Sequence, residues 1–204
     1  MRALFSLTCA CLCLAAGPQP AQRDTHLPFS SADADRFAGK LADMLTRSPA
    51  PSSRQRRPVQ TIVTEPEVNA YLRYRAQDQI PTGVLDPYIF VLGEGRLTGN
   101  ATVDLDAVRL SRERGWLDPM QLLRGQVPVA ATGVLRSRNG FFQFELESAY
   151  AGGVLIPKSL LQELVGFYSR TSANPAGINI DAPFELPAGI REINVKAARA
   201  IIVQ

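Results

Sequence analysis

The sequence is poor in the side chains that carry out most enzyme chemistry. It has one histidine, His26, in a polar and proline-containing stretch, and all three cysteines lie close to the N-terminus. A Ser-His-Asp triad would therefore have no base other than His26, and a Cys-His pair would need an N-terminal cysteine. His, Cys and carboxylate residues at the spacings of metal sites are also absent. We therefore expect a protein that is not an enzyme and that uses no metal or cofactor.

Charge and aromatic content exclude a second class of function. The 22 Lys and Arg residues exceed the 19 Asp and Glu residues by three, which is too small an excess to indicate nucleic-acid binding. Trp116 and the five tyrosines are scattered and form no basic and aromatic face. Gly93 and Gly95 indicate a turn, because no phosphate-binding motif follows them. Asp104 and Asp106 could pair as acid and base, but solvated positions on an amphipathic strand are the simpler interpretation.

The N-terminus has the pattern of a secretory signal peptide. Arg2 is followed by an uninterrupted run of apolar and small residues to Ala16, and then by a Gly-Pro-Gln-Pro-Ala segment. The run is too short for a membrane-spanning helix. We predict a signal peptide over residues 1–21, with cleavage between Ala16 and Ala21, and hence a periplasmic or secreted protein.

Cys9, Cys11 and Cys13 all fall inside this predicted signal peptide. The mature chain would have no disulfide and would depend on its own core for stability. A lipoprotein would keep one cysteine as its first residue, but none of the three follows the Leu and the small residue that such a signal requires. We therefore expect a soluble protein, with a lipidated N-terminus as the alternative.

The remainder divides into two parts by composition. Residues 22–58 are predicted to contain a helix from Ser31 onward and an Arg-, Pro- and Ser-rich linker, and residues 59–204 to form a single domain. The linker has no apolar periodicity and carries Arg54, Arg56 and Arg57. A solvated connector is the first interpretation of these arginines, and a weak basic patch for a membrane surface is the second.

A capping box opens the main domain. Thr64 is followed three residues later by Glu67, and Pro66 lies in what would be the first turn, so a helix is predicted from here to residue 79. Its stripe toward the core is expected to consist of Val68, Tyr71, Leu72 and Arg75.

Alternating strands dominate the rest of the chain. Residues 97–107 alternate with period two, which predicts a strand with one dry face and a bulge or strand break near Ala107. Residues 129–138 and 141–150 flank Asn139-Gly140, which favours a two-residue type I′ hairpin. That turn would place Leu135 opposite Phe144, and Gly133 opposite Leu146, on an apolar face. Further predicted elements are a short helix between residues 118 and 125, a helix over residues 156–170, and strands over residues 178–186 and 190–203.

These elements predict an α+β fold, in which a long, strongly curved antiparallel sheet wraps around one or two amphipathic helices. The inward positions of the strands include many small residues. They are Gly99, Ala101, Ala131, Gly133, Ala149, Ala182 and Ala197. The room that they leave is either filled by larger side chains of the helices or open to an apolar ligand.

Two segments resemble bacterial members of the tubular lipid-binding (TULIP-like) group. They are T-E-P-E-V-N-A-Y-L at residues 64–72 and F-E-L-P-A-G-I-R-E-I-N-V at residues 184–195. The resemblance covers about residues 60–204 and implies a hydrophobic groove for acyl chains between a bent sheet and a long helix. Carried over, it implies a lining of Val103, Leu105, Leu135, Phe142, Phe144 and Leu146, with Leu161, Leu164 and Val165 from the later helix.

Two functions therefore stand beside each other. The first is non-catalytic binding of a lipid or other hydrophobic small molecule in the cell envelope, with lipid transport as one use and a membrane surface as a further partner. The second is a structural or adaptor protein with a filled core that binds another envelope protein.

Overall fold

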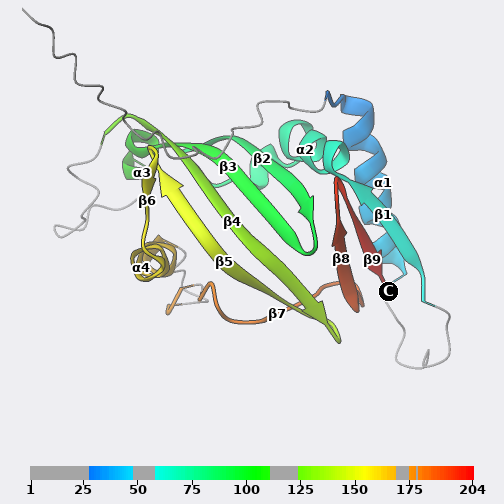
Figure 1. Cartoon of the computed structure of the whole chain (residues 1–204). Helices are drawn as coiled ribbons and strands as arrows, with labels where there is room; N and C mark the ends of the chain where they lie inside the picture. Colours follow the sequence, from blue (N-terminus) through cyan, green and yellow to red (C-terminus); the bar gives the residue numbers. More distant parts are fainter. Residues whose placement is uncertain (1–27, 48–57, 111–123, 169–174, 178) are drawn as a thin grey trace, which may run out of the picture.

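The structure is a computed structural model that describes residues 28–47, 58–110, 124–168, 175–177 and 179–204 (Figure 1). The order of the elements is α1 (Ser31–Thr46), β1 (Gln60–Thr64), α2 (Glu65–Tyr74), the 3₁₀ turn η1 (Gln77–Gln79), β2 (Val84–Gly93), β3 (Arg96–Asp104), α3 (Leu105–Leu110), β4 (Gln126–Arg138), β5 (Phe141–Ala151), β6 (Val154–Leu155), α4 (Lys158–Tyr168), β7 (Phe184–Glu185), β8 (Glu192–Lys196) and β9 (Arg199–Val203). The helix predicted between residues 118 and 125 lies largely outside the described residues.

A long antiparallel sheet forms the body of the protein. Its strands follow the order β2-β3-β4-β5-β6, with β7 beside β5, and it is not closed into a barrel. A second sheet has the order β1-β9-β8. In Figure 1 the small sheet, α1 and α2 lie on the β2 side, and α4 lies on the β6 side. The predicted α+β class and antiparallel sheet are confirmed, whereas wrapping of the sheet around the helices is not, because α2 contacts the edge strand β2 and α4 contacts β5.

The predicted hairpin is confirmed in its turn and its register. Asn139 and Gly140 both have positive φ, at 53° and 83°, as a type I′ turn requires. Arg138 pairs with Phe141, Leu135 with Phe144, and Gly133 with Leu146. The turn therefore fixes which side chains of β4 and β5 share a face.

Helix α2 has the predicted N-terminus but a different buried face. Thr64 donates its backbone N–H and its hydroxyl to the Glu67 carboxylate, at 2.9 and 3.1 Å. The buried residues are Glu65, Glu67, Asn69 and Ala70, whereas the expected stripe of Val68, Tyr71, Leu72 and Arg75 is half-buried or exposed. The buried face predicted from apolar periodicity was wrong, because this helix lies along the free edge of β2. The backbone groups of that edge need polar partners, which the helix supplies.

The strand predicted over residues 97–107 ends earlier than expected. Strand β3 stops at Asp104, and α3 begins at Leu105. The Asp104 carboxylate accepts the backbone N–H of Ala107 at 2.9 Å, as an N-cap does for the first turn of a helix. Of the two possibilities near Ala107, a bulge or a strand break, the structure has the break, where the chain changes from strand to helix.

The C-terminal predictions also need correction. The strand expected over residues 190–203 is the hairpin β8–β9, with Ala197 and Ala198 in its turn. The backbone N–H of Ala198 donates to the Val91 carbonyl at 2.8 Å, so β2 holds this turn in place. Of the strand expected over residues 178–186, the described residues 179–186 form only β7. The Asn179 side chain accepts the backbone N–H of Asp181 at 2.9 Å and makes a turn there instead.

Helix α1 packs on α2. The Lys40 ammonium donates to both oxygens of the Glu67 carboxylate, at 2.6 and 2.8 Å, and to the Ile62 carbonyl at 2.7 Å. The Gln204 amide donates to the Met44 carbonyl at 2.8 Å and fixes the other end of α1. Among the helices of the described segments, none is long and apolar enough to cross a membrane.

Candidate ligand-binding face

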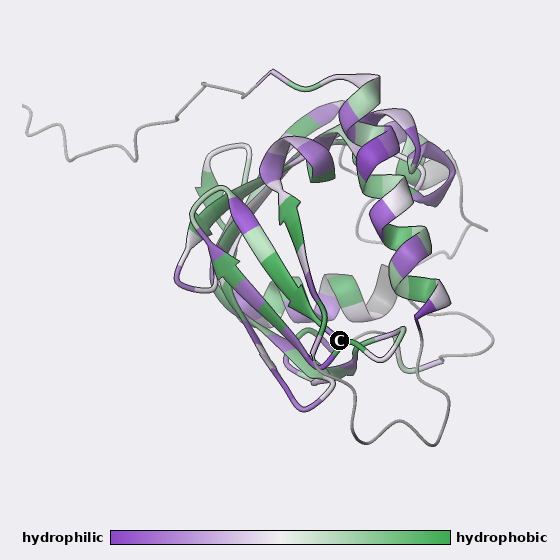
Figure 2. Ribbon diagram, turned by 90° about the vertical axis from the view of Figure 1, so that its right-hand side faces the viewer, coloured by the Kyte–Doolittle hydropathy of each residue, from purple (hydrophilic) through white to green (hydrophobic). Residues whose placement is uncertain are grey.

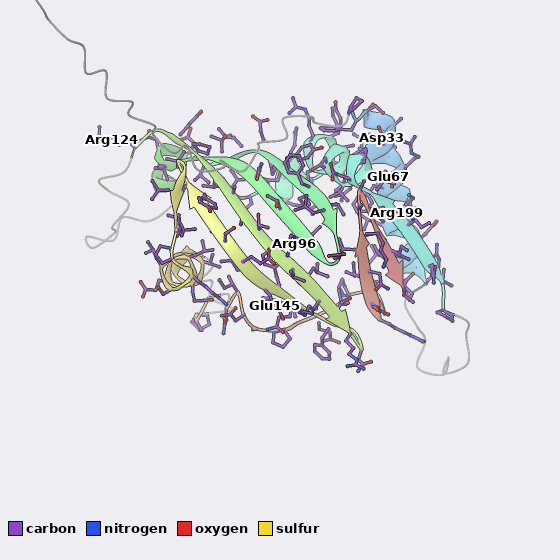
Figure 3. All side chains as sticks on the ribbon, viewed as in Figure 1. Asp33, Glu67, Arg96, Arg124, Glu145 and Arg199 are labelled. Carbon is purple, nitrogen blue, oxygen red and sulfur yellow. The ribbon has the colours of Figure 1, made fainter. Side chains whose placement is uncertain are left out.

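The strand register separates the large sheet into a charged face and an apolar face. The charged face carries ion pairs between strands, one from β3 across β4 to β5 and one between the neighbouring strands β4 and β5. Arg96 binds Glu147 through two hydrogen bonds of 2.9 Å, and Arg136 binds Glu145 at 2.7 Å. The hydrogen bonds from Arg96 hold the pKa of the Glu147 carboxyl below its usual range. Figure 3 labels Arg96 and Glu145 on this sheet.

The opposite positions of β2 to β5 contain no charged residue. We call this surface the apolar face. It consists of Val84, Ile89, Val91, Leu97, Gly99, Ala101, Val103, Val127, Val129, Ala131, Gly133, Leu135, Ser137, Phe142, Phe144, Leu146, Ala149 and Ala151. Figure 2 shows hydrophobic and hydrophilic residues alternating along these strands. Such alternation means that one side of the sheet meets an apolar environment and the other meets water.

The structure brings most of the predicted lining residues together. Val103, Leu135, Phe142, Phe144 and Leu146 lie on the apolar face. Leu105 does not, because it belongs to α3, where it is buried with 7% of its surface exposed. Leu161 and Val165 lie in α4, which contacts β5, and both are half-buried. The side chain of Leu164 lies outside the described residues.

The apolar face is incompletely covered. Within it only Val91, Gly133 and Ala149 are buried, and its large side chains on β3, β4 and β5 are all half-buried. A sheet face that packs fully against a protein core normally has its large apolar side chains buried. The half-buried state of so many of them leaves apolar surface for another molecule.

The small residues of this face behave in two ways. At Gly133 the space left by the missing side chain is filled, because the Phe144 ring would lie 2.5 Å from a Cβ built there. At Gly99 the room is open, because this residue is exposed and a Cβ built there would meet no atom within 4 Å. Gly99 lies between Ile89 and Ala131 on the neighbouring strands. The apolar face thus has an opening over β3.

A cavity of about 590 Å³ lies where the β4–β5 turn meets β8. We call it the tip cavity. It includes Leu135 and Phe142 of the apolar face, and it adds the cationic residues Arg136, Arg138 and Lys196. Sequence reasoning missed these cations, because Lys196 reaches the hairpin only through the contact of β8 with β4, which no local pattern indicates.

Ser137 sets the position of β8 at this cavity. It is the polar residue of the apolar face, and its hydroxyl accepts the Ile193 backbone N–H at 2.6 Å and donates to the Ile193 carbonyl at 3.0 Å. The backbone N–H of Gly140 donates to the Arg191 carbonyl at 3.0 Å. These bonds hold the hairpin tip against the segment that carries Lys196.

A larger cavity, of about 1080 Å³, lies between the end of α2 and the start of β2. The rings of Phe29, Tyr74 and Tyr88 meet at its wall, with centroids 6.2 and 6.4 Å from that of Phe29. Arg73 and Asp86 form an exposed ion pair of 3.2 Å at the same place. In the described part of the chain, no three His, Cys, Asp or Glu side chains are grouped so as to hold a metal ion.

Comparison with known proteins adds little to this geometry. No protein-family model and no curated protein matches the chain. A crystal structure of lipopolysaccharide binding protein aligns with 77% of this chain, at 13% sequence identity and a TM-score of 0.23. The alignment covers 45% of that protein, so this chain spans less than half of its length. At this TM-score the likeness carries no argument about function, and the apolar face has to be interpreted on its own geometry.

Proposed function

We propose that the protein is a non-catalytic binding protein of the cell envelope, which holds a lipid or a similar apolar molecule on the apolar face of its large sheet. The observation that carries this proposal is the half-buried, charge-free surface with its opening at Gly99. Covering this surface would release water from apolar groups, at about 0.8 kcal/mol per buried methylene of an acyl chain. In this proposal α4, whose Leu161 and Val165 are half-buried, covers part of the ligand beside β5.

In this proposal the protein acts in the periplasm or outside the cell, and the signal peptide pattern of the sequence supports this. Residues 59–204 would be the binding domain, and residues 22–58 would tether or support it. The proposal gives the protein no chemical step, since a lipid held by apolar contacts needs none.

The experiment is a comparison of two aromatic substitutions at adjacent, exposed positions on opposite faces of β3. Gly99→Phe fills the opening, where a Cβ meets no neighbour, and Asn100→Phe adds the same ring to the other face. The chain with its own leader is expressed and exported, and native mass spectrometry then measures the bound mass. The wild type and Asn100→Phe should retain lipid, and Gly99→Phe should lose most of it.

Wild-type protein that is free of lipid in repeated preparations, and that binds no added fatty acid, would overturn the proposal. A stoichiometric protein bound in place of lipid would favour the adaptor function instead. Circular dichroism of each variant checks that the sheet has formed.

A further inference from the structure

The tip cavity is lined by residues from both faces of β4 and, unlike the apolar face, it carries charge. Arg136 is paired with Glu145, but Arg138 and Lys196 form no ion pair with any described residue. Glu94, which lies in the β2–β3 turn, is the acidic residue of the lining. The described lining therefore has two cations without an ion pair, Arg138 and Lys196, and one carboxylate, Glu94. The cavity thus has an excess of positive charge.

The same cavity also has an apolar floor. Leu135 and Phe142 line it, and both belong to the apolar face. From Leu135 the apolar face continues along β4 to Ala131, which pairs with Gly99. Four residues of strand span roughly 13 Å. Arg138 alternates with Ser137 and so belongs to the charged face of β4, but it lines the same cavity as Leu135 and Phe142. A molecule with its charged end among the cations can therefore extend its apolar end onto the apolar face.

From this juxtaposition we infer that the ligand is an amphipathic anion, whose head group binds Arg138 and Lys196 in the tip cavity and whose alkyl chain lies on the apolar face. The inference rests on the function proposed above and adds the sign and the position of the head group. Ser137 serves as a positioning residue, because its two hydrogen bonds to Ile193 keep β8, and with it Lys196, beside the hairpin.

The test uses three probes of equal chain length below their micelle concentrations, namely decanoate, decanol and decylamine. Isothermal titration of the full chain, freed of endogenous ligand, measures the affinity for each. Decanoate should bind more tightly than decanol, and decylamine should bind most weakly. In 0.5 M salt the preference for decanoate over decanol should largely vanish, because screening acts on exposed charges.

Substitutions that change charge in opposite directions sharpen the test. The double variant Arg138→Gln/Lys196→Gln should weaken decanoate binding roughly five- to tenfold, the range expected for two exposed ion pairs, and leave decanol unchanged. Glu94→Gln should strengthen decanoate binding about twofold. Arg124→Gln/Arg199→Gln removes the same charge at exposed positions outside the cavity and should change neither affinity (Figure 3).

The outcomes separate the two proposals. Equal affinities for decanoate and decanol, with no effect of the double variant at the tip, would overturn the anionic head group and leave apolar binding standing. An equal loss of decanoate affinity in both double variants would also overturn it, because net charge and not the tip cavity would be responsible. Absence of binding by all three probes would overturn the proposed function itself.

Discussion

At the scale of single residues, the polar side chains of α2 explain how the helix and the sheet are joined. Asn69, with 1% of its surface exposed, accepts the Ile89 backbone N–H at 2.7 Å and donates to the Ile89 carbonyl at 2.8 Å. The Glu65 carboxylate accepts the Val91 N–H at 2.7 Å and the Tyr88 hydroxyl at 3.2 Å. These side chains supply the partners that a further strand would otherwise provide.

Replacing Asn69 should therefore destabilise the protein strongly. Asn69→Leu leaves both backbone groups of the half-buried Ile89 without their partner, and such a group costs about 1–3 kcal/mol when water cannot replace the partner. We expect a loss of about 3 kcal/mol or more in the free energy of unfolding, measured by urea titration. Asn100→Leu, at an exposed position on β3, should change it by less than about 0.5 kcal/mol. A loss of similar size in both variants would contradict the role given to Asn69.

Glu67 makes the attachment of α1 dependent on pH. Burial opposes ionisation of this carboxyl, but hydrogen bonds from Lys40 and Thr64 outweigh it, so its pKa lies below the ordinary 4.5. In the unfolded chain the group takes up a proton near pH 4.5, before the folded chain does. The stabilisation is therefore complete above pH 4.5 and is lost as the pH falls through the lower pKa of the folded state.

The variant Glu67→Gln tests the direction of this pH dependence of stability. The variant should be less stable than the wild type at pH 7, by about 2 kcal/mol for charged hydrogen bonds to a buried group. The difference should shrink when unfolding is measured below pH 4.5. Glu192→Gln removes an exposed carboxylate that has no ion pair with the described residues, so it should have little effect at either pH. A deficit of Glu67→Gln that stays constant with pH would show that packing, and not charge, is responsible.

At the scale of elements, two glycines with different backbone conformations give a paired prediction. Gly140 has φ of +83° in the hairpin turn, and Gly39 lies in the middle of α1 with open space around it. Gly140→Ala should cost about 1 kcal/mol, because a Cβ disfavours positive φ. Gly39→Ala should stabilise the protein by up to about 1 kcal/mol, because alanine favours a helix. Thermal unfolding midpoints should therefore move in opposite directions, and a shift of both in the same direction would contradict this assignment.

The elements that could be predicted from the sequence are those fixed by a short sequence motif. The start of α2 and the β4–β5 hairpin follow from a capping box and an Asn-Gly turn, so both were predicted correctly. The β8–β9 turn was missed because Ala198 adopts positive φ without any turn signal, held there by the Val91 carbonyl. The buried face of α2 was missed for a related reason, since its partners lie on a strand about twenty residues away. Of the candidate site, the apolar strand positions were predictable, but Leu105 and the cations of the tip cavity were not.

At the scale of the whole molecule, ligand binding and stability should be linked. A ligand that binds only the folded state adds RT ln(1 + [L]/Kd), about 2.7 kcal/mol at a hundredfold excess over Kd. Protein stripped of lipid by chromatography on a hydrophobic resin should therefore unfold at a lower temperature than the exported form. Added decanoate should restore the midpoint of the wild type but not that of Gly99→Phe. An unchanged midpoint after stripping and reloading would argue that the apolar face is empty in both forms.

The side chains that satisfy strand edges also bear on how copies of this protein meet. Asn69 and Glu65 occupy the free edge of β2, and Ser137 occupies the backbone groups of Ile193 on β8. Fibrils and strand-swapped dimers grow by adding a strand to such an edge, and here those hydrogen-bonding positions are already taken. Despite its uncovered apolar surface, the protein should therefore resist strand addition at these positions of β2 and β8. These intramolecular hydrogen bonds should thus also disfavour strand pairing between neighbouring chains.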